Sequence, residues 1–158
     1  METFFAETVV GTVCIHSAGD ALTELDFVDR PSSGELMPMP SILKQAFEAE
    51  RVGQGSILCP SGTPFQFEVW NALLKISRGE ILSYGELAAR IGRKGSARAV
   101  GQAVGANRLA LLIPCHRVVT SSGKTSGFRW GVSRKRRLLD LESKGKGINS
   151  LFLKFFSA

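Results

Sequence analysis

The chain has 158 residues, of which 44% are hydrophobic and 22% are charged, and its formal net charge is +6. This composition is ordinary for a globular protein and excludes a disordered or low-complexity chain, while the length suits one domain or one domain with a small companion. No apolar run approaches the roughly 20 residues that span a bilayer, so we expect no membrane association.

Residues 1–60 are expected to form a small α/β domain. Their β-branched and apolar residues predict strands over 8–16 and 22–28, and Ser17–Asp20 between them can form a hairpin turn. Apolar residues at helical spacing return over 41–51, which predicts a helix after the strands.

Residues 61–144 are expected to form a second, mainly helical domain. Pro64 suits the first position of a helix and is followed by an apolar stripe. Residues 118–127 have the composition of a turn-rich hairpin or wing, and residues 132–143 predict a final basic helix. We expect residues 145–158 to be a flexible tail.

Two short helices within this domain indicate a helix-turn-helix. Ser83 and Glu86 have the spacing of a capping box, and Ser96 can cap a second helix that runs to about Ala106. The second helix is rich in Ala and Gly, which indicates a close backbone approach, either to a neighbouring helix or to the groove of a nucleic acid. Arg98, the one charged residue in this helix, favours the second alternative.

Basic residues are concentrated in one stretch of the chain. Residues 1–60 carry nine acidic and three basic side chains, whereas the 48 residues from Arg90 to Arg137 carry twelve Lys and Arg and no acidic residue. Such a block attracts polyanions, so nucleic-acid binding is favoured over an ordinary solvated basic face.

The three cysteines are Cys14, Cys59 and Cys115. Their odd number, without a C-x-x-C pair or zinc-ligand spacing, predicts free thiols in a reducing, cytoplasmic setting and no bound metal. Cys115 lies between a proline and a His-Arg pair in Pro114–Val118, and such neighbours lower the pKa of a thiol. Cys115 is therefore the candidate nucleophile, with a structural cysteine as the alternative. Since neighbours on an extended strand point apart, a water or a local turn must complete the proton path to His116.

Around this cysteine the chain resembles the 6-O-methylguanine-DNA methyltransferase family. The resemblance runs from about Gly62 to Glu142, and the stretch Arg129–Lys135 is similar to the C-terminal half of the bacterial adaptive-response (Ada) protein. Besides the Pro-Cys-His-Arg-Val motif, the matching segments in order are Gly62-Thr-Pro-Phe-Gln66, Val69-Trp70, Ser83-Tyr84, Arg98-Ala-Val100, Asn107 and Leu138-Leu139.

The resemblance implies DNA repair by an irreversible reaction. An alkyl group would pass from the 6-oxygen of guanine, and also from the 4-oxygen of thymine, in double-stranded DNA to Cys115, so that each protein molecule acts once. It further implies an α/β protein in which a small ribonuclease H-like domain precedes a winged-helix-like DNA-binding domain. The protein would act as a monomer and without a cofactor.

The resemblance also implies roles for individual residues. Cys115 would be the nucleophile, His116 its base through a water, and Glu142 the group that helps to hold the pair as thiolate and imidazolium. Asn107 would fasten the hinge between the helix-turn-helix and the active-site loop. Tyr84 would protonate the departing guanine and rotate the target phosphate.

Arg98 would fill the space that the extruded base leaves in the duplex. Backbone groups around Val118, together with Ser121, would recognise the base. Phe128 replaces a tyrosine that is common in the family, and Trp130 could narrow the pocket against bulky adducts. The expected contacts to substrate or DNA besides Tyr84 and Arg98 are Arg93, Ala97, Val118, Ser121, Phe128, Trp130 and Lys135.

Three other interpretations stay open. A non-catalytic helix-turn-helix DNA binder or regulator explains the charge but gives the cysteine motif no purpose. A thiol hydrolase or redox protein explains Cys115 and His116 but does not need the basic block. Alkyltransferase-like lesion binders carry Trp at the cysteine position, which Cys115 argues against.

Overall fold

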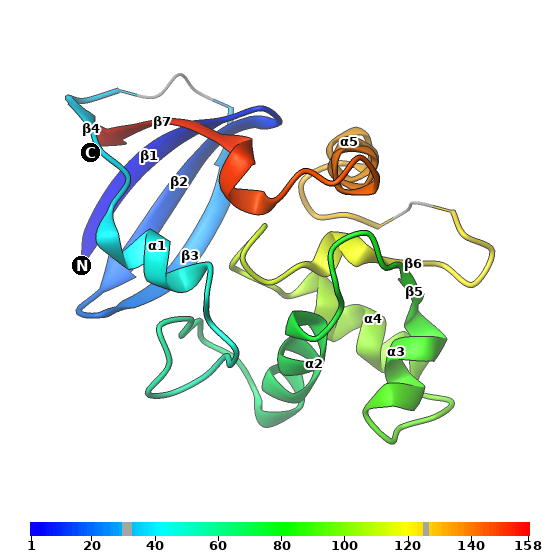
Figure 1. Ribbon diagram of the computed structural model, residues 1–158. Coiled ribbons are helices and arrows are strands. Elements are labelled where there is room, and N and C mark those ends of the chain that lie inside the picture. The colour runs from blue at the N-terminus through cyan, green and yellow to red at the C-terminus, as the bar shows by residue number, and fades with distance from the viewer. Residues whose placement is uncertain (30–32, 125–126) are drawn as a thin grey trace. The chain divides into compact units, whose positions relative to one another are not determined.

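The computed structural model divides the chain into two units, each with its own set of contacts (Figure 1). It describes residues 1–29, 33–124 and 127–158. The first unit comprises Met1–Ser61, Arg108–Leu112 and Gly147–Ala158, and the second comprises Gly62–Asn107 and Ile113–Lys146. Two segments that follow residue 61 thus belong to the first unit, because they pair with strands formed by the start of the chain. The expected α/β class is confirmed.

The first unit is built on an antiparallel five-stranded sheet with the order β3-β2-β1-β7-β4 (Figure 1). The strands are β1 (Glu2–Thr8), β2 (Gly11–Ala18), β3 (Ala21–Val28), β4 (Leu36–Met37) and β7 (Phe152–Ser157). Val13 and Ile15 in β2 and Leu22 and Leu25 in β3 are fully buried and belong to the core of this unit. The helix α1 (Ser41–Ala46) contacts β3 and is shorter than the predicted 41–51.

The prediction of one strand over 8–16 is wrong, because the chain turns at Val9 and Val10. The Thr8 hydroxyl accepts a hydrogen bond from the Val10 N–H at 3.1 Å and donates one to the Gly11 carbonyl at 2.7 Å. Gly11 has a φ of 132°, which residues with a side chain rarely adopt. Two valines predict a strand, but the Thr8 side chain and Gly11 supply the turn that composition does not indicate.

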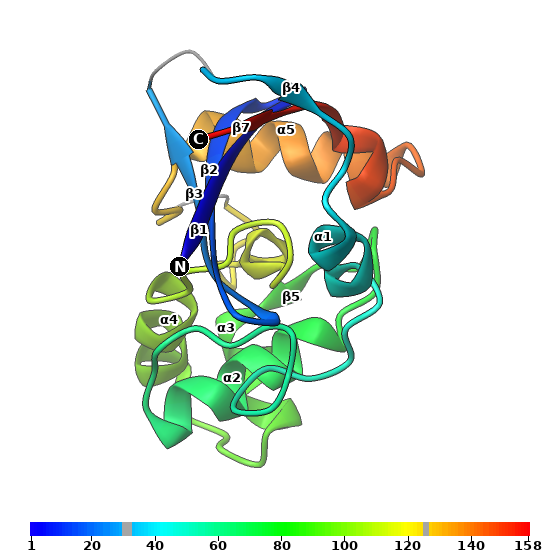
Figure 2. The same cartoon turned by 90° about the vertical axis from the view of Figure 1, so that its left-hand side faces the viewer.

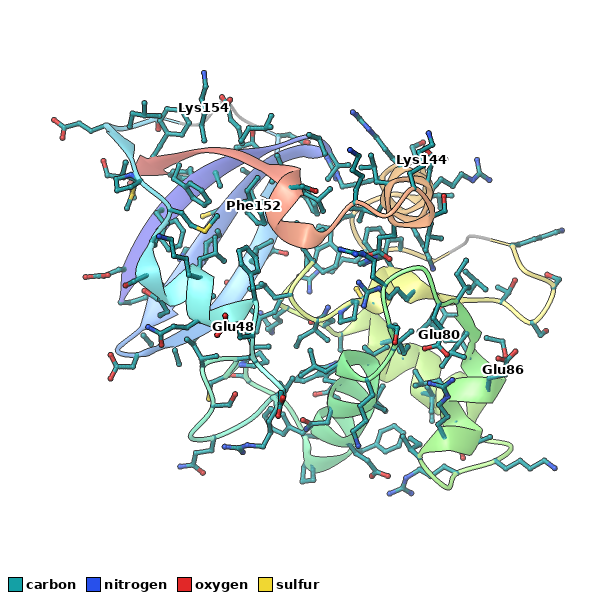
Figure 3. All side chains as sticks on the ribbon, viewed as in Figure 1. Glu48, Glu80, Glu86, Lys144, Phe152 and Lys154 are labelled. Carbon is teal, nitrogen blue, oxygen red and sulfur yellow. The ribbon has the colours of Figure 1, made fainter. Side chains whose placement is uncertain are left out.

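The flexible tail expected over 145–158 is not observed, since its last residues form β7 between β1 and β4. Phe156 lies opposite Phe5 and Phe155 opposite Ala6 in the antiparallel register. The rings of Phe152 and Phe155 stack with centroids 5.7 Å apart; Phe152 is labelled in Figure 3. The preceding residues form a 3-10 helix, η2 (Ile148–Leu151). The strand depends on partners at the opposite end of the sequence, so local composition could not indicate it.

The second unit is mainly helical, and α4 packs against both α2 and α3 (Figures 1 and 2). The fully buried Trp70 donates its indole N–H to the Ala103 carbonyl at 2.9 Å and so links α2 to α4. The helices are α2 (Pro64–Leu74), α3 (Tyr84–Arg90), α4 (Ala97–Gly105), α5 (Val132–Ser143) and the 3-10 helix η1 (Cys115–Arg117). No helix in the described ranges is long and apolar enough to cross a bilayer.

The predicted helix starts at Pro64 and after Ser83 are confirmed. Thr63 and Gln66 form a reciprocal capping box before Pro64, and the Ser83 hydroxyl accepts the Glu86 N–H at 3.0 Å. Ser96, by contrast, makes no side-chain capping bond at the start of α4. Ser83 therefore caps α3 through the Glu86 N–H, which is one half of the expected capping box, whereas Ser96, with φ −98° and ψ 28°, does not cap α4.

The hairpin expected over 118–127 is replaced by a parallel pairing, although residues 125 and 126 lie outside the described ranges. The strands β5 (Leu82–Ser83) and β6 (Val118–Val119) pair in parallel. A turn follows in which the Thr120 hydroxyl accepts the Lys124 N–H at 3.1 Å. This pairing matters for the site, because it ties the start of α3 to the segment that follows η1.

Candidate active site around Cys115

Cys115 opens a single turn of 3-10 helix that follows Pro114. It is 4% exposed, and His116 is 2% exposed. The chain turns here and does not continue as an extended strand, so Cys115 and His116 are not forced onto opposite faces. A local turn is therefore present, but it brings no hydrogen-bond partner to Nδ1 of His116 among the described residues. None of the three cysteines, all of which lie in the described ranges, forms a disulfide.

A small cavity of about 10 Å³ lies against Cys115 within the second unit. Tyr84, Phe128, Trp130 and Lys135 are the other expected site residues on its wall. The complete lining is Tyr84, Val104, Gly105, Cys115, Gly127, Phe128, Arg129, Trp130 and Lys135. The sulfur is thus reached through a narrow space bounded by three aromatic rings and two cationic side chains.

Glu142 on α5 holds both His116 and Arg117. Its Oε1 is 2.7 Å from His116 Nε2. Arg117 donates from Nε to Oε2 of Glu142 at 2.9 Å and from Nη2 to Oε1 at 2.8 Å. The remaining Arg117 Nη1 donates to the Ile76 carbonyl at 2.7 Å. Burial raises the pKa of Glu142, but the hydrogen bonds from His116 and Arg117 outweigh it and bring the pKa to about 2. Glu142 is therefore ionised at neutral pH.

The ionised Glu142 determines which nitrogen of His116 is the base. A carboxylate only accepts hydrogen bonds, so Nε2 carries the hydrogen in the 2.7 Å contact. Burial lowers the pKa of His116 despite the opposing effect of Glu142, so the ring is neutral at neutral pH. The lone pair then lies on Nδ1, which is buried and has no hydrogen-bond partner among the described residues. His116 therefore presents a basic nitrogen in a buried position.

Burial favours the neutral thiol of Cys115, which acts against the expected thiolate–imidazolium pair. Burial raises its pKa to about 11, against the opposing effects of the Asn107 hydrogen bond and of the charges on Lys135 and Arg129. Two isolated charges in a buried site cost more in desolvation than they recover, and both groups accordingly stay neutral. The neighbouring cations that the sequence indicated are present but do not outweigh burial.

Asn107 connects the end of α4 to the segment that carries Cys115. It is 1% exposed, and its Nδ2 donates to the Ile113 carbonyl at 3.0 Å. Its side chain also hydrogen-bonds Cys115, which favours the ionised form of the thiol. One amide thus fixes both the backbone before the nucleophile and the nucleophile itself, which is the arrangement required for the fastening role expected of Asn107.

Tyr84 is positioned by the short parallel sheet. It is the first residue of α3, directly after β5, and Ser83 lies opposite Val119 in β6. Burial, together with the nearby Cys115, raises the pKa of Tyr84, so its hydroxyl remains a proton donor. The Tyr84 ring lies next to Gly101 on α4, where an added Cβ would make an ordinary contact with it at 3.6 Å.

The exposed side of α4 carries two long and two small residues. Arg98, Ala99, Gln102 and Gly105 are exposed on this helix, whereas Val100, Ala103 and Val104 are buried. A Cβ added at Gly105 would meet nothing within 4 Å, so packing within the chain does not account for this glycine. The small residues therefore leave backbone accessible from outside, which favours the nucleic-acid alternative over helix packing. Ala97, at the start of the helix, is half-buried.

Residues 64–144 match the family model described as the DNA-binding domain of 6-O-methylguanine DNA methyltransferase. A methylated-DNA–protein-cysteine methyltransferase from Mycobacterium tuberculosis (strain H37Rv) is 40% identical over 146 residues, which cover 86% of this chain and 88% of the relative. The chain belongs to the 6-O-methylguanine-DNA methyltransferase family.

Solved structures of the family share the fold. The crystal structure of Mycobacterium tuberculosis OGT in complex with DNA matches with a TM-score of 0.71 and 38% identity, covering 94% of this chain and 98% of that chain. The regulatory protein ada of Salmonella typhimurium is 55% identical over 83 residues, which are 52% of this chain and 24% of that protein. The resemblance inferred from the cysteine motif is thus confirmed at the level of family and fold.

Two residues expected to contact DNA in this family member are engaged within the chain. Lys135 is 1% exposed, and its ammonium donates to the Val118 carbonyl at 2.6 Å. Arg93 forms a bidentate pair with Glu68, with Nε–Oε1 and Nη2–Oε2 distances of 3.2 and 3.0 Å, and its guanidinium lies 5.1 Å from the centre of the Phe65 ring.

The basic block is partly neutralised by acids from outside it. Each of four arginines in the block pairs with a glutamate that lies outside residues 90–137; Glu80 is labelled in Figure 3. These pairs are Arg90–Glu80, Arg93–Glu68, Arg108–Glu24 and Arg117–Glu142. The surface available to a polyanion is therefore smaller than the charge of the linear block suggests.

The expected base-recognition residues are distributed unevenly. Val118 is fully buried in β6, and Ser121 lies in the exposed turn after it; neither lines the cavity. Phe128 and Trp130 do line it and meet edge to face with ring centroids 5.3 Å apart. The turn at Thr120 carries Ser121 to the surface, which the spacing along the sequence could not indicate.

Arg117 is the functional residue that the sequence reasoning missed. It belongs to the quoted motif, but it was counted only as a member of the basic block. The half-buried guanidinium completes the hydrogen bonding of Glu142 and reaches back to Ile76. Its position directly after the Cys-His pair is the one signal in the sequence that could have indicated this role.

Proposed function

We propose that this protein repairs DNA by moving an alkyl group from the 6-oxygen of guanine to the sulfur of Cys115, after which the molecule is spent. The observation that carries the proposal is a buried thiol at a narrow cavity, held by Asn107 and followed by the His116–Glu142 pair. The names of the relatives and the DNA-bound structure of the Mycobacterium tuberculosis protein support it.

The chemistry starts from a neutral thiol and a neutral imidazole. The proton of Cys115 passes through a water to Nδ1 of His116, and the charge that develops on the ring is stabilised by ionised Glu142. The sulfur then attacks the alkyl carbon, the S–C bond forms, and the electron pair of the breaking C–O bond passes to the guanine oxygen. Tyr84 donates a proton to the guanine and regains one from solvent, and His116 releases its extra proton to solvent. In the net reaction, guanine gains the proton that the thiol loses.

The burial of Cys115 requires the base to leave the duplex. A guanine inside the stack cannot reach a sulfur that is 4% exposed. Extrusion costs a few kcal/mol, and less for a badly paired alkylated base. The exposed Arg98 on α4 would occupy the space that the base leaves, while the small residues around it let the helix approach the minor groove closely. Ala97 would face the DNA backbone at the start of the same helix.

Three further features complete the proposal. The 4-oxygen of alkylated thymine would react by the same displacement, because the leaving group is again an exocyclic oxygen that becomes a carbonyl. Phe128 and Trp130 would pack against the base in the cavity. The protein would act as a cytoplasmic monomer.

Mass spectrometry tests the proposal directly. The protein is mixed with an equimolar duplex that contains one O6-methylguanine and is then digested. We expect one added methyl group on the peptide that contains Cys115. The Cys115→Ser protein should gain none while its affinity for the same duplex is retained. Binding by the wild type without any change of mass would instead favour a non-catalytic DNA binder, and repeated turnover would favour a hydrolase.

A further inference from the structure

Lys135 is a buried cation that the proposed reaction does not yet use. It is 1% exposed on α5, and its Nζ donates to the Val118 carbonyl at 2.6 Å. It also lies on the wall of the cavity that reaches Cys115, and its Nζ is 5.9 Å from the centre of the Phe128 ring. Placing an ammonium in such a site costs several kcal/mol unless other groups compensate for lost hydration.

The interaction between Lys135 and Cys115 is reciprocal. Burial lowers the pKa of Lys135, and ionised Cys115 acts in the opposite direction. Lys135 in turn favours the ionised form of Cys115, which burial disfavours. The other groups that act on Cys115 are the Asn107 amide and Arg129. Arg129 is exposed, so solvent screens its charge more than that of Lys135.

We propose that Lys135 is a positioning residue of the alkyl transfer, whose ammonium, held in place by the Val118 carbonyl, stabilises the Cys115 sulfur as it becomes a thiolate. The inference rests on the proposed function, and it gives the buried lysine a role that a neutral side chain could not fill. Tyr84 and His116 are the remaining titratable groups around the sulfur, and both are neutral at rest. Among the side chains that favour the ionised form of Cys115, Lys135 is then the buried cation.

The test measures the reactivity of Cys115 without DNA. The rate of carboxamidomethylation by iodoacetamide is followed at pH 8 on the peptide that contains Cys115, which separates it from Cys14 and Cys59. Well below the thiol pKa the rate is proportional to the thiolate fraction. Removing an opposite charge at close range raises a pKa by about one unit or more, so the rate for Lys135→Met should fall about tenfold. Arg137→Met, which removes an exposed charge from the same helix, should leave the rate unchanged.

Two further variants separate charge from hydrogen bonding. Lys135→Gln keeps a donor for the Val118 carbonyl without the charge and should react as slowly as Lys135→Met. Lys135→Arg keeps the charge and should recover most of the wild-type rate. A rate for Lys135→Gln equal to that of the wild type would overturn the inference. A rate for Lys135→Arg as low as that for Lys135→Met would overturn it as well, provided that thermal unfolding shows both variants folded.

The transfer reaction provides the second readout. Single-turnover methyl transfer should slow in Lys135→Met and Lys135→Gln by the same factor as carboxamidomethylation. If the wild type transfers no methyl group, the proposed function fails while the thiol measurement still tests the lysine. If the wild type transfers and the lysine variants match it in both assays, the inference alone fails.

Discussion

At the scale of single residues, the site depends on the ionised Glu142. A neutral group at this position would leave Arg117 with an uncompensated charge and would no longer fix the hydrogen on Nε2 of His116. The basic Nδ1 would then be lost for part of the molecules, because the other tautomer becomes accessible. One carboxylate therefore controls both the charge balance and the direction of proton transfer.

The same carboxylate should make stability depend on pH in the acid range. The pKa of Glu142 is about 2 in the folded protein, against an ordinary value of 4.5. A depressed pKa contributes stability that is fully present above pH 4.5 and is lost as the pH falls toward 2. The difference corresponds to about 3 kcal/mol.

Urea unfolding between pH 7 and pH 3 measures this contribution. The free energy of unfolding of Glu142→Gln should be lower than that of the wild type at pH 7, and the difference should shrink as the pH falls. A difference that stays constant over this range would show that the charge of Glu142 does not contribute. The exposed Asp140→Asn on the same helix is the matched control.

Trp130 should set the size of the adduct that the cavity accepts. Its ring lines the cavity and packs edge to face on Phe128, with ring centroids 5.3 Å apart. Trp130→Gly removes this wall, so benzyl transfer should accelerate by at least about tenfold relative to methyl transfer, since a lost steric clash of over 1.4 kcal/mol corresponds to that factor. Single-turnover rates on O6-methyl and O6-benzyl guanine in duplex DNA give the ratio of benzyl to methyl transfer. An equal ratio in the wild type and in Trp130→Gly would contradict the prediction.

At the scale of elements, two glycines near helices should respond in opposite ways to alanine. A Cβ at Gly62 would lie 2.6 Å from the buried Trp70 ring, which is bonded to Ala103 of α4. Gly62→Ala should therefore destabilise the protein by about 1–3 kcal/mol through overpacking. At Gly105 the same change meets nothing within 4 Å and replaces a weak helix former, so stability should rise by up to about 1 kcal/mol.

Measuring DNA binding tests whether Gly105 is needed for a close contact between α4 and DNA. If the exposed backbone of α4 meets DNA, Gly105→Ala should weaken binding to duplex DNA by severalfold although the protein becomes more stable. Chemical denaturation and fluorescence anisotropy on the same samples give both quantities. Unchanged DNA affinity in a stabilised Gly105→Ala protein would leave α4 without a role at the groove.

The elements that could be predicted from the sequence are those whose signals are local. Pro64 with its capping residues and the Ser83 cap marked two helix starts, and the apolar spacing gave α5 its observed bounds of Val132–Ser143. β7 was not predictable, because its backbone hydrogen bonds are made with β1, a strand at the opposite end of the chain. The turn at Val9 was missed since a side chain, that of Thr8, closes it.

The same division holds for the site. The motif identified Cys115 and His116 because the two residues and their activating neighbours are adjacent in the sequence. The hydrogen-bond partners of Arg117, Lys135 and Arg93 lie on α5, β6 and α2, respectively, and the spacing of residues along the chain does not predict them. The resting protonation of the thiol also follows from burial, which composition does not reveal.

At the scale of the whole molecule, the charge that DNA meets depends on which cations are already paired. A phosphate contact releases counterions, so each such contact changes the slope of log affinity against log salt by about 0.9. Arg93 is held by Glu68 at 3.0 and 3.2 Å, whereas Arg98 is exposed on α4. Arg93→Gln should leave the affinity for duplex DNA within about twofold and the salt slope unchanged.

Arg98→Gln should behave differently in the same salt titration. Its loss should weaken binding severalfold, and methyl transfer should slow further than binding alone explains, because the extruded base returns to the stack when nothing fills its place. Anisotropy between 50 and 200 mM salt, combined with single-turnover transfer at saturating protein, separates the two effects. Equal losses of affinity for Arg93→Gln and Arg98→Gln would mean that Arg93 leaves Glu68 when DNA binds. The DNA interface would then use all the basic residues of the block 90–137 and not only those that are unpaired with acids in the folded protein.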